Sequence, residues 1–215
     1  MTLTRKYPYI VIEGPIGSGK TTLAHKLAER FSAQLLLENA GANPFLAQFY
    51  EDPGRHALAT QLFFLFQRAE QLRGLAQPDL FDEATIADFF LEKDPLFARL
   101  TLNDGEFTLY RNIYQHLQVQ ATPPDLVLYL QTPVDALLER INKRGIAYEK
   151  SITHDYLERL AASYSEFFHQ YEAAPVLTVN NEHFDVATSD EAFNLLLERI
   201  EKMRGRREYF NPNLA

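Results

Sequence analysis

A glycine-rich segment near the N-terminus holds the residues that most directly indicate chemistry. Residues 14–21, GPIGSGKT, fit the pattern G-x-x-x-x-G-K-[ST] at every specified position. Such a loop wraps an anion with its backbone N–H groups, and bulky side chains would obstruct that approach. We expect Lys20 to reach the β- and γ-phosphates of a nucleotide and the Thr21 hydroxyl to bind Mg²⁺. The residues assigned to this phosphate-binding loop are Gly14, Gly17, Ser18, Gly19, Lys20, Thr21 and Thr22.

Further polar residues could serve an acceptor molecule. Glu38 follows a predicted strand, where a carboxylate can take a proton from an attacking hydroxyl. Gln61 and Arg68 share one helix face and could read the edge of a heterocycle. The cations Arg140 and Arg144 end another helix and could close over phosphates. Each position also has an ordinary explanation: a solvated strand end, the solvent boundary of a helix, and cations at a helix C-terminus.

Strands ending at one edge of a sheet must position these candidates. Short apolar runs predict five strands, at residues 9–12, 35–37, 84–87, 126–130 and 175–179. Helical spacing of apolar residues predicts helices at 21–31, 44–50, 57–76, 107–120, 132–143, 153–171 and 189–203. The alternation predicts an α/β fold with a five-stranded parallel sheet flanked by helices. We expect a single domain over residues 1–215, with residues 41–43 as a loop and residues 205–213 as a tail.

Composition excludes several classes of protein. The chain has no cysteine, which excludes disulfide scaffolds, thiol catalysis and cysteine zinc sites. Its formal charge of −8, from 21 basic and 29 acidic residues, argues against a nucleic-acid polymer as partner but leaves small phosphorylated ligands open. No apolar run approaches the ~20 residues of a membrane span, and the N-terminal run is too short for a signal peptide. We therefore expect a soluble, cytoplasmic protein without a membrane partner.

Taken together, the motifs resemble those of the deoxyribonucleoside kinases, in particular the bacterial deoxyadenosine/deoxyguanosine kinase-like members. The resemblance runs from about residue 9 to residue 171. It rests on GPIGSGKTT, on Glu38 five residues before Asn43-Pro44-Phe45, on FYEDP, on the spacings Gln61…Arg68 and Asp88…Asp94, and on RINKRGIAYEKSI. The resemblance implies a P-loop kinase fold, ATP and Mg²⁺, and a lid at about residues 140–150.

The resemblance also implies a role for each matching residue. Glu38 would be the base for the 5′-hydroxyl, and Lys20 and Arg144 would join it in catalysis. Tyr50 and Glu149 would hold the sugar 3′-hydroxyl. Residues on the base would be Gln61, the polar pair Arg68 and Asp94, and the aromatic Phe97. Arg140 and Arg144 would contact the phosphates of the donor, and Asp88 would help Thr21 to hold Mg²⁺.

The chain departs from the family pattern where charge matters. The family has Arg and Ser after the acid that ends the third strand, whereas Phe89 and Phe90 follow Asp88 here, and Ile146 replaces a third lid arginine. Either Lys20, Arg140 and Arg144 supply the missing charge or turnover is reduced. Loss of one donor to developing charge can cost on the order of 10²–10³ in rate.

The leading hypothesis is transfer of the γ-phosphoryl group of ATP to the 5′-hydroxyl of a deoxyribonucleoside, a purine one in particular. One alternative is a kinase of nucleoside monophosphates or another small metabolite. A charged acceptor needs arginine near Glu38, and residues 32–53 contain none, which disfavours this alternative. The other is a non-catalytic, nucleotide-binding regulatory subunit. The broad apolar face of residues 57–76 predicts a homodimer.

Overall fold

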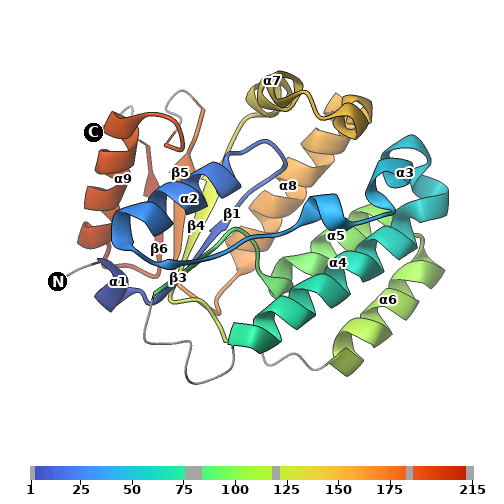
Figure 1. Ribbon diagram of the computed structural model, residues 1–215, viewed down its shortest axis with the longest axis horizontal. Helices are drawn as coiled ribbons and strands as arrows, with labels where there is room; N and C mark the ends of the chain where they lie inside the picture. Colours follow the sequence, from blue (N-terminus) through green and yellow to red (C-terminus); the bar gives the residue numbers. More distant parts are fainter. Residues whose placement is uncertain (1–2, 76–83, 118–121, 183–185, 212–215) are drawn as a thin grey trace.

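A parallel sheet of six strands lies at the centre of the molecule, in the order β2-β3-β1-β4-β5-β6 (Figure 1). The computed structural model describes residues 3–75, 84–117, 122–182 and 186–211. Its strands are β1 Tyr9–Glu13, β2 Gln34–Leu36, β3 Thr85–Ala87, β4 Leu126–Gln131, β5 Val176–Asn180 and β6 Arg207–Phe210. Every neighbouring pair is parallel. The predicted α/β class and its five strands are confirmed.

The predicted number of strands is wrong, because the sheet has a sixth strand where a tail was expected. β6 pairs with β5 from Arg207 opposite Val176 to Phe210 opposite Val179. Its sequence REYF has a single buried residue, since it is an edge strand with exposed side chains. Pairing with β5, rather than an apolar run of its own, defines this strand.

Helices surround the sheet on both faces (Figure 1). They are α1 Leu3–Lys6, α2 Lys20–Phe31, α3 Leu46–Glu51, α4 Pro53–Leu75, α5 Asp94–Thr101, α6 Asp104–Leu117, α7 Val134–Arg144, α8 His154–Gln170 and α9 Asp190–Lys202. Short 3₁₀ segments are η1 Ala40–Ala42, η3 Leu91–Lys93 and η4 Ala147–Ser151. All seven predicted helices are present, whereas α1 and α5 were not predicted. The predicted helix ends at 76 and 118–120 lie outside the described residues.

The sheet separates two apolar cores, as the alternation along β1 shows. Tyr9 and Val11 belong to one buried cluster and Ile10 and Ile12 to the other, because successive strand residues point to opposite faces. One core contains α1, α2 and α9, and the other contains α4, α5 and α8. α6 packs against α4 on the outside (Figure 1). No helix in the described ranges is both long enough and apolar enough to span a bilayer.

The order of the strands determines where a site can form. β1 lies between β3 and β4, while the chain continues from β1 to β2 beyond β3. The loop after β1, Glu38 after β2 and Asp88 after β3 therefore meet at the carboxyl edge of the sheet. Ligands of open α/β sheets bind at this edge, in the crevice where the strand order reverses.

Candidate active site

The phosphate-binding loop connects β1 to α2 and has the backbone that an anion site needs. Gly17 has φ 86° and Gly19 has φ 91°, values that favour glycine. Gly19 precedes α2, whose first turn has no side-chain cap, so backbone N–H groups face the loop. The Lys20 Nζ atom donates to the carbonyl oxygens of Gly14 at 2.8 Å and Pro15 at 3.2 Å. Burial lowers the pKa of Lys20, and the neighbouring Lys93 ammonium lowers it further.

Asp88 connects this loop to the predicted base. Its Oδ2 atom accepts a hydrogen bond from the Thr21 hydroxyl at 2.5 Å, and its Oδ1 atom accepts one from the Glu38 backbone N–H at 2.7 Å. A hydroxyl and a carboxylate side by side are oxygen ligands of the kind that Mg²⁺ takes beside nucleotide phosphates. The two residues predicted for the metal therefore lie together and fit a hard divalent cation.

The Glu38 carboxylate lies among cations. The Arg68 guanidinium forms an ion pair with Glu38 through one nitrogen and with Asp94 through the other. Lys93 Nζ lies 3.9 Å from Glu38 Oε2. Burial alone would raise the pKa of Glu38, but Arg68, Lys93 and Lys20 outweigh it and lower that pKa to about 2. The carboxylate is therefore ionised and can accept a proton throughout the physiological range.

A cavity beside the loop brings most of the predicted site residues together. From the loop side it is lined by Gly17, Lys20, Thr21 and Asp88. Predicted acceptor residues that line it are Glu38, Tyr50, Gln61, Arg68, Phe97 and Glu149. Asp94 does not line it, since this residue is 1% exposed and lies behind Arg68 as its ion-pair partner. Gly14 and Ser18 are buried within the loop, and Thr22 is exposed on α2.

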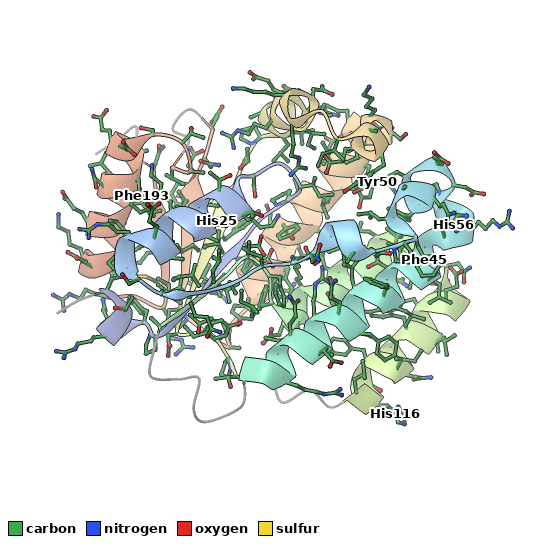
Figure 2. The ribbon with its side chains drawn as sticks, in the orientation of Figure 1. His25, Phe45, Tyr50, His56, His116 and Phe193 are labelled. Atoms are coloured by element: carbon green, nitrogen blue, oxygen red, sulfur yellow. The ribbon has the colours of Figure 1, made fainter. Side chains whose placement is uncertain are left out.

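The predicted lid residues have different surroundings. Arg144 donates to both carboxylate oxygens of Glu149, from Nε at 3.1 Å and from Nη2 at 2.6 Å. Figure 2 shows Tyr50 on α3, on the side nearest the segment that follows α7, and its ring stacks on that of Tyr148 at 5.9 Å. Arg140 does not line the cavity, and its Nη2 atom donates to the Asn181 carbonyl oxygen at 3.2 Å. Arg144 and Glu149 thus face the cavity as a pair.

The residues at the departure from the family pattern belong to the core. Phe89 and Phe90 are 0% and 1% exposed and pack in the cluster on the α4, α5 and α8 side. The two lid arginines expected to replace the missing charge do not converge on Glu38. The cation that lies beside it together with Arg68 is Lys93, which the sequence analysis did not select.

Three further polar residues were also missed. Glu13 ends β1, and its Oε2 atom accepts hydrogen bonds from the Gly14 N–H and the Tyr164 hydroxyl, both at 3.1 Å. Asn181 is fully buried and donates to the Ser18 carbonyl oxygen at 2.9 Å, which ties the loop to the chain beyond β5. An acid directly after an apolar strand was a usable signal for Glu13, whereas Tyr164 and Asn181 carry no local signal.

Glu38 has an arginine beside it although residues 32–53 contain none. A charged acceptor was disfavoured because residues 32–53 contain no arginine, yet α4 brings Arg68 into contact with Glu38. That arginine is already shared between two carboxylates, Glu38 and Asp94. Arg68 already has two carboxylate partners, so it is not free to bind the phosphate of a charged acceptor.

Comparisons with known proteins agree with this geometry. Residues 10–204 match the family model described as deoxynucleoside kinase. A deoxyguanosine kinase of Bacillus subtilis is 33% identical, over 91% of this chain and 97% of that protein. A deoxyadenosine kinase of Lactobacillus acidophilus is 30% identical, over 91% and 96%. The solved structure of deoxyadenosine kinase from M. mycoides with bound dCTP superposes with a TM-score of 0.76 at 25% identity, over 90% of this chain and 99% of that one.

Proposed function

Because this chain belongs to the deoxynucleoside kinase family, and so is an ATP-dependent deoxyribonucleoside kinase, we propose a specific reaction for its site. The γ-phosphoryl group of ATP passes to the 5′-hydroxyl of a deoxyribonucleoside, with purine deoxyribonucleosides preferred. The observation that carries this proposal is the pair of hydrogen bonds made by Asp88, which joins Thr21 of the loop to Glu38. Donor and acceptor groups thereby meet at one point of the sheet edge.

Each group has a part in the transfer. Glu38 accepts the proton of the 5′-hydroxyl while the 5′-oxygen of the deoxyribonucleoside forms a bond to the γ-phosphorus. The bond from that phosphorus to the β,γ-bridging oxygen breaks, and its electron pair leaves with ADP. Lys20 moves from the carbonyl oxygens of its own loop to the β- and γ-phosphates. Arg144 exchanges its Glu149 partner for phosphate oxygens, so that Glu149 becomes available to the sugar.

Thr21 and Asp88 would hold Mg²⁺ at the end of β3. A bound cation supplies neutralisation of the charge on the donor phosphates. The Asp88 carboxylate also fixes the Glu38 backbone, so the metal ligand and the base keep a constant spacing.

Purine preference is supported by two observations. The named relatives above act on deoxyguanosine and deoxyadenosine. Gln61 and Arg68 lie on one helix and both line the cavity, where the Gln61 amide can meet a base edge while Arg68 is held by Glu38 and Asp94. A purine offers hydrogen-bonding edges to such groups and a flat face to Phe97.

The protein acts as one kinase domain over residues 1–215, with residues 140–150 as its lid, and works in the cytoplasm, where ATP is abundant. We also propose a homodimer through α4 and α6. Phe66 on α4 is 51% exposed and Leu109 on α6 is 49% exposed, and an interface on these packed helices would remove both side chains from water.

A transfer assay tests the reaction. The purified protein is mixed with Mg²⁺, ATP labelled at the γ-phosphate and each of the four deoxyribonucleosides, and labelled monophosphate is quantified. We expect product with the purines, and a fall of about 10²–10⁴ in kcat for Glu38→Gln, because a positioned base contributes that much. Glu51→Gln, an exposed glutamate on α3, serves as the control. Absence of transfer by the wild type, or full activity of Glu38→Gln, would refute the proposal.

A further inference from the structure

Lys93 is a buried lysine at the active site. Its side chain is 2% exposed, at the end of η3, and it lines the same cavity as Lys20 and Glu38. Its Nζ atom lies 2.8 Å from Glu13 Oε1 and 3.9 Å from Glu38 Oε2. Lysine is rarely buried to this degree, and a buried charge needs partners that compensate for its lost hydration. Here the partners are two carboxylates, one of them the base.

The first partner, Glu13, is itself held firmly. Its Oε2 atom accepts from the Gly14 N–H and from the Tyr164 hydroxyl, so only Oε1 is directed at Lys93. Glu13 ends β1 and precedes the phosphate-binding loop directly. Lys93 is therefore held at a fixed distance from the loop while its ammonium group faces Glu38.

The other cations near the cavity have different sets of partners. Arg68 is shared between Glu38 and Asp94, and Arg144 pairs with Glu149. Lys20 lies on the carbonyl oxygens of its own loop and is directed at the donor phosphates. Of these cations, Lys93 is the one placed between the end of β1 and the base, where the acceptor oxygen and the γ-phosphorus must meet.

From this geometry we infer that Lys93 is a catalytic cation of phosphoryl transfer, held in place by Glu13. The inference rests on the proposed function. As the 5′-oxygen bonds to the γ-phosphorus and its proton passes to Glu38, Lys93 keeps its own proton and donates to the transferring phosphoryl oxygens. Its charge compensates the negative charge that those oxygens carry. Glu13 is a positioning residue, since it acts through Lys93.

A comparison of four protein variants distinguishes a catalytic role of Lys93 from a purely structural ion pair with Glu13. Removing Lys93 alone leaves the Glu13 charge buried and unpaired, which can unfold a protein, whereas removing both charges of a pair is often tolerated. We therefore compare the wild type, Glu13→Gln, the double variant Glu13→Gln/Lys93→Met, and a control. The glutamine of the first variant retains an oxygen for the Gly14 N–H and the Tyr164 hydroxyl. The control is Lys26→Met/Asp190→Asn, which removes a lysine–aspartate pair of 2.7 Å that lies outside the cavity.

Thermal unfolding, kcat and the KM for the deoxyribonucleoside are measured for all four. We expect the double variant to stay folded and its kcat to be about 10²–10³ lower than that of Glu13→Gln, with a much smaller change in KM. We expect the control to match the wild type. Equal kcat values for Glu13→Gln and the double variant would overturn the inference. Failure of the proposed function is separately visible as absence of transfer by the wild type and the control.

Discussion

Gly17 occupies a constrained position of the phosphate-binding loop. Its φ is 86°, and a Cβ atom there would lie 2.9 Å from the Leu137 carbonyl oxygen and 3.0 Å from Ile141 Cγ1. Gly145, at the C-cap of α7, also has a positive φ, of 71°, but nothing lies within 4 Å of its Cβ position. The two glycines share the backbone requirement and differ in the space around them.

Alanine at these two positions should therefore have unequal effects. We expect Gly145→Ala to lower the free energy of unfolding by about 1 kcal/mol, the cost of a left-handed residue with a side chain. Gly17→Ala should lower it by more than about 2 kcal/mol, because the backbone of α7 must also move. Urea denaturation measures both values, and calorimetry measures ATP affinity, which should fall for Gly17→Ala. Equal losses of stability would show that the contact with α7 is unimportant.

Site residues that belong to a local motif could be predicted from the sequence, whereas residues that depend on distant partners could not. The loop could be predicted because its specified positions fall within residues 14–21, between a strand and a helix. Lys93 could not, because its partners Glu13 and Glu38 come from two other strand ends and meet it only when the sheet has formed. The pairing of Arg68 with Glu38 was out of reach for the same reason. The type and spacing of residues identify candidate groups, whereas the folded arrangement of the strand ends, α4 and η3 decides which of these groups become partners.

At the scale of elements, one carboxylate secures the turn into β6. Glu208 Oε1 accepts from the backbone N–H groups of Arg204 at 2.7 Å and Gly205 at 2.6 Å. Glu208 Oε2 forms an ion pair of 2.5 Å with Arg199 of α9. The backbone hydrogen bonds from Gly205 and Arg204, and the charge of Arg199, lower the pKa of Glu208. The edge strand that sequence analysis missed is thereby tied to the last helix.

These contacts give a pH-dependent prediction. A carboxyl whose pKa is lower in the folded state stabilises the fold above its ordinary pKa and loses that effect as pH falls through the folded value. We expect Glu208→Gln to lower the free energy of unfolding by about 1 kcal/mol at pH 7. The gap from the wild type should narrow below about pH 4.5. Urea titrations between pH 8 and pH 3, with exposed Glu201→Gln of α9 as control, measure this gap. A gap that stays constant over that range would contradict the role of ionised Glu208.

Elements were predictable where their own sequence carried the pattern. β1 and β4 are buried along almost their whole length, so each reads as an apolar run without reference to neighbours. β6 has one buried residue, and α5 is a helix of 8 residues that begins at Asp94. Neither segment was recognised from its own sequence, and contacts with other elements stabilise both. The start of α4 also differs from the prediction: the helix begins at Pro53 and not at residue 57. Proline is well suited to a first helical turn.

At the scale of the whole molecule, the proposed homodimer can be tested. If α4 and α6 form the interface, the double substitution Phe66→Asp/Leu109→Asp places charge in it and should yield monomers with intact secondary structure. Tyr209→Asp, at a 54% exposed aromatic on β6, should leave the assembly unchanged. Light scattering at micromolar concentration gives the masses. A monomeric wild type, or a doubly substituted protein that still dimerises, would exclude this interface.

The two hydrogen bonds of Asp88 have a consequence for how each substrate affects the binding of the other. Because one Asp88 oxygen accepts from Thr21 beside the donor and the other accepts from the Glu38 backbone beside the acceptor, we expect binding of either substrate to change the hydrogen bond that Asp88 makes on the other side. Thermodynamic linkage then requires that ATP change nucleoside affinity by the same factor as nucleoside changes ATP affinity. Calorimetry with a non-hydrolysable ATP analogue, with and without nucleoside, measures both factors. Such reciprocity would let the enzyme register the presence of both substrates before either one reacts.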